Sequence, residues 1–288
     1  MSADAWPAPA KLNLFLHVTG RRPDGYHDIQ TVFQLVDLAD RLHFSPRGDA
    51  EIRRVDGPPD VAPEEDLAVR AAHRLRAACG VGRGVDIRLE KRIPIQGGLG
   101  GGSSDAATTL VALNEIWGLR LAPSLLAVLG LELGADVPLF VHGETAWGEG
   151  VGERLTPLTL PERHFAIVFP GVGIRTAEVF QAPELTRKTP ETTIRGFLKA
   201  GGRNDCEPVV TGRSPEVRRA LAWLALRGEA RMTGTGSCVF AAFADRASAE
   251  AALVGLPLEW RGFVARGLDR SPLQERLAAE RSNGSGRF

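Results

Sequence analysis

The sequence has no excess of charge of either sign. Its 288 residues include 35 Lys and Arg against 35 Asp and Glu, so the formal net charge at pH 7 is zero. A protein without a positive field has no general electrostatic attraction to nucleic acid or to an anionic membrane. Any anionic partner must therefore be bound by a local site, and we expect the partners to be small molecules.

Cysteine and long apolar runs are also scarce. The three cysteines, Cys79, Cys206 and Cys238, show no C-x-x-C spacing, which argues against a disulfide framework or a zinc cluster. The longest uncharged apolar stretch, residues 121–131, is far too short to span a membrane, and the N-terminus lacks a signal-peptide pattern. We therefore expect a soluble, cytoplasmic protein, either a monomer or a dimer.

Lysine is rare among the basic residues. Only four of the 35 are lysine, at positions 11, 91, 188 and 199, and the rest are arginine. Where arginine is the default, a lysine can mark a position that needs a compact, movable ammonium group. These four positions are therefore candidates for a functional role.

The length exceeds that of an ordinary single domain and suits two. Apolar residues that alternate predict strands, and those spaced by three or four predict helices. In the first half these patterns predict a strand at 11–18, a turn at 22–27, an apolar segment at 29–39, a helix from Pro63 to Gly80, a strand at 84–93, a helix at 103–117, a short helix from Pro123 to about Gly134, and then another strand. Glycines punctuate residues 147–155, where we place the boundary between domains at 1–155 and 156–288.

The second half alternates between strand and helix patterns. The predicted elements are a strand at 165–169, helices at 177–181 and 215–226, a strand at 238–243, a helix at 245–254 and a strand at 260–266. This order is typical of an α+β layer in which helices back an antiparallel sheet. The polar, glycine-rich tail from about residue 281 is expected to be disordered.

A run of glycine in "PIQGGLGGGSSDAATTL" (94–110) lies between a strand and an amphipathic helix. Five of the six positions from 97 to 102 are glycine. Bare backbone N–H groups at the positive end of a helix dipole form a site for a phosphate. A tight turn with a serine cap is the simpler alternative, but so many glycines in this context favour the phosphate site.

This loop fits neither of the two common phosphate-binding patterns. No lysine follows the glycines, so it is not a G-x-x-x-x-G-K-[ST] loop. Ser103 stands where the third glycine of a dinucleotide-binding G-x-G-x-x-G would lie. The loop therefore belongs to another class.

The glycine run resembles the phosphate loop of the GHMP small-molecule kinases. Residues 231–243, "RMTGTGSCVFAAF", resemble the C-terminal glycine motif of that superfamily. Residues 7–40, with a K-x-N strand and "DGYH", resemble the branch whose alcohol substrate carries cytidine diphosphate. The similarity covers almost the whole chain.

The resemblance implies a two-domain α+β fold with the active site in the cleft between the domains. The N-terminal domain would resemble the second domain of ribosomal protein S5, and the C-terminal domain would be ferredoxin-like. The implied activity is ATP-dependent phosphorylation of the 2-hydroxyl of a cytidine-diphosphate-linked methylerythritol, with Mg²⁺ accompanying ATP. Another GHMP kinase acting on mevalonate, homoserine or a sugar is the alternative, and a non-catalytic anion- or RNA-binding protein is a more distant one.

Two residues would carry the chemistry. The resemblance assigns the base that accepts the hydroxyl proton to Asp136, which read alone is an ordinary aspartate in a turn. It places Lys11 beside that base, where an ammonium stabilises developing negative charge. The strand period puts Lys11 and Asn13 on one face.

The binding residues follow from the same resemblance. For ATP they are Lys91, Pro94, Ile95, Gly97, Gly98, Leu99, Gly100, Gly101, Gly102, Ser103 and Ser104, with Gly234 and Gly236 shaping the far wall. For the alcohol substrate they are Asn13, Tyr26, His27, Asp136 and Thr176. Tyr26, the only tyrosine, would stack on the cytosine and His27 would bond its edge. The metal ligands are left unassigned.

Three positions depart from the family pattern. Gln96 stands where a glycine commonly opens the loop, Asp66 where an asparagine is frequent near the nucleotide, and Arg175 where a serine usually precedes Thr176. The first two bear on nucleotide affinity and the third on the substrate side.

Overall fold

The structure, a computed structural model, describes residues 5–284. The first half contains β1 (Trp6–Arg21), β2 (His27–Arg47), β3 (Ile52–Asp56), α1 (Leu67–Cys79), β4 (Gly84–Glu90), α2 (Gly101–Ile116), α3 (Pro123–Leu131), α4 (Val137–His142), β5 (Ala146–Glu149) and β6 (Arg154–Pro157). The second half contains β7 (His164–Phe169), α5 (Thr176–Gln181), α6 (Ile194–Ala200), α7 (Glu207–Arg213), α8 (Pro215–Ala225), β8 (Arg231–Met232), β9 (Val239–Phe243), α9 (Arg246–Ala251), β10 (Arg261–Leu268) and α10 (Pro272–Gly284).

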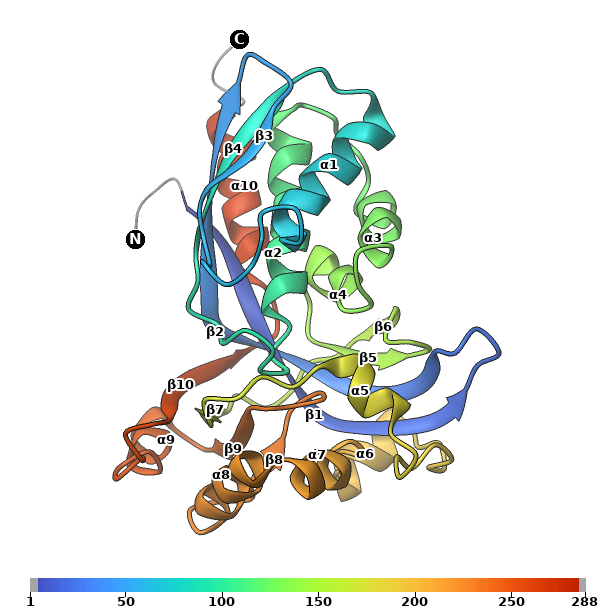
Figure 1. The fold of residues 1–288 in the computed structure, drawn as a ribbon, viewed down its shortest axis with the longest axis vertical. Coiled ribbons are helices and arrows are strands. Elements are labelled where there is room, and N and C mark those ends of the chain that lie inside the picture. The colour runs from blue at the N-terminus through green and yellow to red at the C-terminus, as the bar shows by residue number, and fades with distance from the viewer. Residues whose placement is uncertain (1–4, 285–288) are drawn as a thin grey trace.

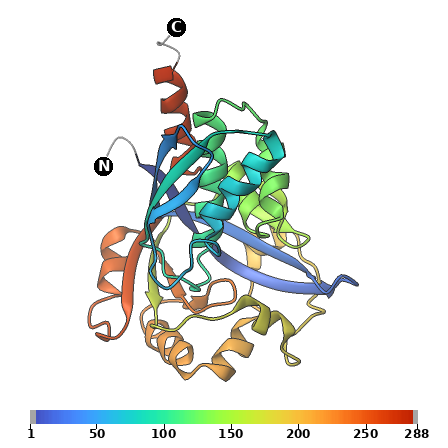
Figure 2. The same ribbon diagram turned by 45° about the horizontal axis from the view of Figure 1, so that its top comes forward.

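The β1–β2 hairpin connects the two halves of the molecule. The two strands pair antiparallel from Trp6↔Leu42 to Arg21↔His27, so the predicted strand at 11–18 is the middle of a longer one. In Figures 1 and 2 the hairpin begins beside the layer of α1–α4 and extends along the C-terminal helices. The middle of β1 is covered on both faces. Lys11 and Asn13 on one face are as buried as Leu12 on the other.

One sheet runs through both halves. Its order is β3-β4-β2-β10-β7-β9-β8, with β1 and β5 also paired to β2 and β6 paired to β5. The β10 strand joins β2 at Gly267↔Val36 and Leu268↔Leu35. In the second half, β10, β7 and β9 pair antiparallel and carry α8 and α9, as the strand-helix order predicts. The two-domain α+β architecture is thereby confirmed.

Two main hydrophobic cores lie on this sheet. The first packs α1, α2 and α4 on β2 and β4, and it includes Leu273 of α10. The second packs the C-terminal helices on β7 and β9, and it includes Leu16 and Val18 of β1. Each half of the chain therefore contributes apolar side chains to the core of the other, which ties the two together. Residues 147–155, where we predicted the domain boundary, form the β5–β6 hairpin.

Three local expectations differ from the structure. The α1 helix begins at Leu67 rather than Pro63, because Asp66 caps it by accepting a bond from the Ala68 N–H at 2.9 Å. Residues 137–142, where no helix was predicted, form α4, a short helix with Pro138 in its first turn and Gly143 (φ 70°) after its end. The α10 helix continues to Gly284, and the rest of the tail predicted to be disordered, 285–288, lies outside the described residues.

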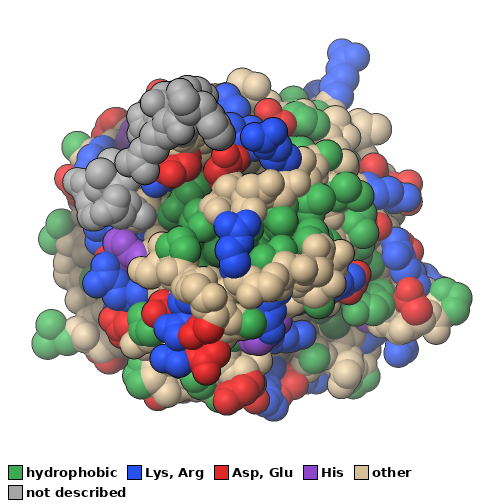
Figure 3. All heavy atoms as spheres, turned by 90° about the horizontal axis from the view of Figure 1, so that it is seen from above, with side chains coloured by type: hydrophobic (Ala, Val, Ile, Leu, Met, Phe, Trp, Pro, Cys, Tyr) green, Lys and Arg blue, Asp and Glu red, His purple; other side chains and the backbone are tan. Residues whose placement is uncertain are grey.

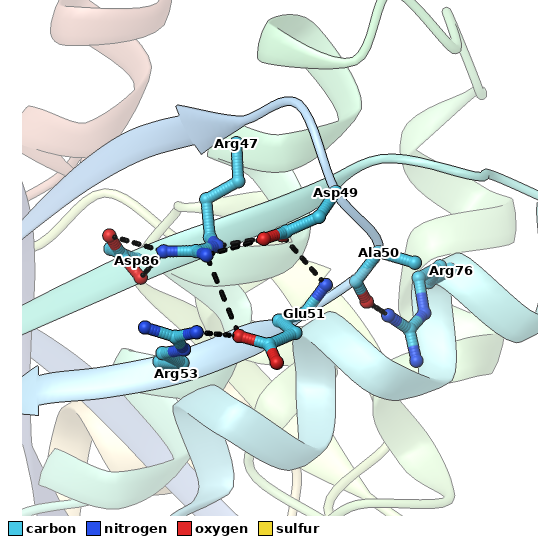
Figure 4. Close-up of polar contacts among 7 residues, drawn as sticks. All are labelled: Arg47, Asp49, Ala50, Glu51, Arg53, Arg76 and Asp86. Carbon is cyan, nitrogen blue, oxygen red and sulfur yellow. Dashed lines mark hydrogen bonds and ion pairs between the residues drawn. The ribbon is translucent and has the colours of Figure 1, made fainter.

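Charges of both signs are mixed over the surface that the structure describes. Around the β2–β3 turn, Arg47 pairs with Asp49, Asp86 and Glu51, and Glu51 also contacts Arg53 (Figure 4). Seen from above, basic and acidic side chains are mixed around hydrophobic ones, and neither sign of charge forms a continuous patch (Figure 3). Within the described part of the chain, no helix has the length and hydrophobicity needed to cross a bilayer.

Candidate active site

A cleft of about 540 Å³ lies along the glycine loop. Its walls come from the first half of the chain on one side and from α5 and the loop before β9 on the other. The predicted residues that line it are Lys11, Asn13, Lys91, Pro94, Ile95, Gly97, Gly98, Leu99, Gly100, Gly101, Gly102, Ser103, Asp136, Thr176 and Gly234. The structure therefore brings most of the predicted site residues to one cavity.

The glycine loop turns its carbonyl groups toward the protein. The carbonyl oxygens of Gly97, Gly98 and Leu99 accept bonds from the Cys238 N–H (3.0 Å), Lys11 Nζ (3.1 Å) and the Lys11 N–H (3.0 Å), respectively. Among the described residues, no group accepts a hydrogen bond from the backbone N–H groups between positions 97 and 103. These unpaired donors lie at the start of the 16-residue α2, which is the arrangement that an anion site requires.

Only a glycine fits at position 98. Its φ is 76°, and an added Cβ would lie 2.3 Å from the carbonyl oxygen of Thr233. Gly234 approaches from the other side, since its added Cβ would lie 3.0 Å from the Gly98 oxygen. The two glycine motifs therefore meet backbone to backbone. Gly236 is not among the residues that line the cleft, and its added Cβ would meet Met232 at 2.8 Å.

Lys11, Asn13 and Asp136 form a polar group at the cleft floor. Lys11 Nζ donates to Asn13 Oδ1 at 2.5 Å and lies 3.5 Å from Asp136 Oδ2. The Lys11 side chain is 4% exposed and that of Asp136 is 29% exposed, so the carboxylate is the more accessible partner. Asn13 Nδ2 in turn donates to Thr31 Oγ1 at 2.9 Å, which fixes the amide.

The carboxylate of Asp136 has no capping role. Asp136 immediately precedes α4, the position where an aspartate usually accepts bonds from the first helical N–H groups. Its side chain makes no such bond. The carboxylate instead faces Lys11, which favours the functional interpretation of this residue over that of a simple helix cap.

Lys91 is held between two buried carboxylates. Its Nζ donates to Asp40 Oδ2 at 2.5 Å and to Asp105 Oδ2 at 2.7 Å. Burial opposes the charge of Lys91, but Asp105 and Asp40 outweigh it and raise the lysine pKa. Burial raises the pKa of Asp105 to about 8. Neither carboxylate was predicted as a site residue, although an aspartate directly after the apolar run "QLVDLA" and one after "GGSS" at the start of a helix are signals in the sequence.

Tyr26 and His27, which were predicted to bind cytosine, lie at the far end of the β1–β2 hairpin and are not among the residues that line the cleft. Tyr26 is 61% exposed, while His27 is buried and its ring stacks on Phe180, with centroids 5.2 Å apart. Arg187 Nε donates to His27 Nε2 at 3.1 Å. Burial, Arg187 and Arg21 lower the pKa of His27. Phe180 itself lines the cleft, so His27 contacts the cleft wall from behind.

Thr176 and the two loop serines differ in accessibility. Thr176 is the first residue of α5, and its Oγ1 lies 2.9 Å from Thr235 Oγ1 on the cleft wall. Ser103 lines the cleft, whereas Ser104 is fully buried and its Oγ has no partner among the described residues. Ser104 is therefore placed behind the loop rather than on the cleft wall.

The three departures from the family pattern have different structural settings. Gln96 adopts φ 55°, a left-handed conformation that glycine takes at less cost. Asp66 lines the cleft but is engaged with Arg54 Nη1 at 2.8 Å as well as with its helix cap. Arg175 is exposed and pairs with Glu178 at 3.6 Å.

Comparison with known proteins gives the family. Residues 66–144 match the GHMP kinases N terminal domain and residues 185–261 match the GHMP kinases C terminal domain. The 4-diphosphocytidyl-2-C-methyl-D-erythritol kinase of Halorhodospira halophila is 55% identical over 282 residues, which is 97% of this chain and 98% of that protein. The chain belongs to the 4-diphosphocytidyl-2-C-methyl-D-erythritol kinase family of GHMP kinases.

Other members of this kinase family agree in sequence and in structure. The enzyme of the same name from Thiobacillus denitrificans is 55% identical over 95% of this chain and 98% of its own. A crystal structure of 4-(cytidine 5'-diphospho)-2C-methyl-D-erythritol kinase superposes with a TM-score of 0.80 at 35% identity, covering 91% of this chain and 98% of that one. A mevalonate kinase structure, at TM-score 0.68 and 16% identity over 92% and 99% of the two chains, shares the fold.

Proposed function

We propose that this protein transfers the γ-phosphoryl group of ATP to the 2-hydroxyl of 4-diphosphocytidyl-2-C-methyl-D-erythritol, in the non-mevalonate route to isoprenoids. The observation that supports it most directly is the Lys11–Asp136 pair at the floor of a cleft lined by the glycine loop. The 55% identity to kinases of that name supports the choice of substrate. Two of its cysteines are buried and all three are free, which suits a cytoplasmic enzyme.

The glycine loop would hold the nucleotide phosphates. Its unpaired N–H groups and the α2 dipole favour negative charge. Mg²⁺ would neutralise charge on the transferring phosphate. Since Mg²⁺ usually takes phosphate oxygens, waters and one or two carboxylates, the carboxylates on the cleft wall suit it, and Asp136 and Glu65 are the accessible ones.

The transfer needs a proton acceptor next to the substrate hydroxyl. Asp136 is the accessible carboxylate beside Lys11, and its oxygens are not engaged in a helix cap. It would accept the hydroxyl proton while the oxygen attacks the γ-phosphorus in line and ADP leaves. Lys11, fixed by Asn13 and by the Gly98 carbonyl, would hold its ammonium against the developing charge without needing to move.

The first test is a comparison of alcohols. ADP release from Mg-ATP would be measured with the cytidylyl methylerythritol substrate and, separately, with mevalonate, homoserine and galactose. We expect turnover with the cytidylyl substrate alone. Turnover with another alcohol would leave the kinase class intact and reject this substrate. Salt-dependent RNA binding without any turnover would favour the non-catalytic alternative.

Replacing Tyr26 with alanine should raise the KM of the cytidylyl substrate by about 10-fold, because stacking on an aromatic ring contributes about 1–3 kcal/mol per base. The KM of ATP should change by less than about 2-fold, since Tyr26 lies at the hairpin end and not on the cleft wall. At 61% exposure Tyr26 adds little to the core, so folding should be unaffected. Steady-state kinetics of Tyr26→Ala and of the control Tyr26→Phe, which keeps the ring, would measure this. An unchanged KM in Tyr26→Ala would contradict the role in base binding.

A further inference from the structure

Beyond the last residue pair of β2 and β4, the side chain of Asp40 takes the place of the backbone in holding the two segments together. The last pair is Arg41↔Glu90. One residue earlier on β2, Asp40 Oδ1 accepts hydrogen bonds from the backbone N–H groups of Arg92 (2.5 Å) and Ile93 (2.9 Å). Asp40 is completely buried, so its carboxylate is shielded from water. They hold the chain in place as it leaves β4 for the glycine loop.

The second oxygen of Asp40 reaches the same loop by another route. Asp40 Oδ2 accepts the bond from Lys91 Nζ, which also bonds Asp105, the fifth residue of α2. Two of the three residues that Asp40 holds, Lys91 and Ile93, lie against Gly101, the first residue of α2. A Cβ added there would lie 3.0 Å from Ile93 Cγ2 and 3.3 Å from Lys91 Nζ. A displacement at Asp40 would therefore reach the N–H groups that face the cleft.

We propose that Asp40 is a positioning residue for nucleotide binding, which fixes the glycine loop without touching the nucleotide. The inference rests on the proposed function only in taking a nucleotide phosphate as the ligand of the loop. A carboxylate is needed at this position because two N–H groups and an ammonium converge on it. Asparagine offers a single oxygen, so its NH₂ group would face a donor in either orientation.

Asp105 provides a matched control for the contact with Lys91. Asp40 and Asp105 contact the same ammonium, with side chains 0% and 3% exposed. Asp105 Oδ1 has no hydrogen-bond partner among the described residues, so an asparagine there could keep the one bond that Asp105 makes. Both Asp→Asn changes therefore replace a carboxylate that contacts Lys91, but only Asp40→Asn disturbs the bonds to Arg92 and Ile93.

The test measures Mg-ADP binding by calorimetry to the full-length wild type, Asp40→Asn and Asp105→Asn. We expect Asp40→Asn to weaken ADP binding by about 10-fold or more relative to Asp105→Asn, because a buried unpaired donor is costly. In turnover assays the KM of ATP should rise in Asp40→Asn, while the KM of the alcohol stays within about 3-fold. A purely structural defect would instead move both KM values together.

Two results would overturn the proposal. Equal changes in ADP affinity for the two variants would show that only the contact with Lys91 matters, and an unchanged affinity in Asp40→Asn would exclude positioning. If Asp40→Asn does not fold, Asp40→Glu keeps both oxygens and the charge but moves the carboxylate by one methylene. It should also weaken ADP binding selectively, and wild-type affinity there would count equally against the proposal. ADP binding needs no alcohol, so these results stand even if the proposed substrate is wrong.

Discussion

Replacing Asp136 with asparagine should lower kcat by about 10²-fold or more, the contribution expected of a general base. The asparagine has nearly the same shape but cannot accept the hydroxyl proton. Asp136 makes no helix cap and is partly exposed, so its loss should leave the fold intact. The KM values should change little, because the carboxylate acts in the transition state rather than in ground-state binding. Single-turnover kinetics at saturating ATP would measure the chemical step directly.

The partner of Asp136 gives this prediction a control. Lys11→Met should also slow the reaction, since it removes the ammonium 3.5 Å from the carboxylate. If the two residues act as a unit, the double variant should be much less impaired than the product of the single effects. A kcat for Asp136→Asn within about 3-fold of wild type, with unchanged thermal stability, would assign the proton transfer to another group.

The part of the site that could be predicted from sequence is the part built from local patterns. The strand period places Lys11 and Asn13 on one face, and their side chains do bond each other. The glycine run between strand and helix likewise predicts free N–H groups at the start of α2, where the structure has them. In both cases the geometry of a single element determines the relative positions of the residues.

The part that could not be predicted depends on contacts between distant segments. Asp40 is an ordinary polar residue at the end of an apolar run until the chain from β4 returns beside it. Arg187 lies 160 residues from His27 along the chain, and no spacing rule connects them. The backbone contact of Gly98 with Thr233 is of the same kind.

Short helices were the main omission in the fold. The α6 and α7 helices have seven residues each and carry glycine in their interior, so neither local propensity nor periodicity indicates them. They are held by packing instead, through Phe197 in α6 and through Val209 and Val210 in α7, all of which are buried. The tertiary fold rather than the local sequence therefore determines these helices.

Replacing Gly98 with alanine should lower the free energy of unfolding by about 2–5 kcal/mol, since a left-handed alanine costs about 1–2 kcal/mol and overpacking about 1–3 kcal/mol. The new Cβ would lie 2.3 Å from the Thr233 oxygen and 2.9 Å from that of Gly236. Both atoms are backbone and cannot rotate away, so the two glycine motifs would have to separate. Because the same movement displaces the N–H groups of the loop, ADP should lose its stabilising effect in thermal unfolding.

Gly102 in the same loop is the control for this effect. Its φ is not positive, and an added Cβ would meet only Leu67 Cδ1, at 3.3 Å, which is the end of a flexible side chain. Gly102→Ala should therefore change the unfolding free energy by less than about 1 kcal/mol, since alanine also suits a helical position. Urea unfolding of both variants separates the two cases. Equal stabilities would mean that the loop does not approach Thr233 as closely as described, and that the cleft is formed without this contact between its two walls.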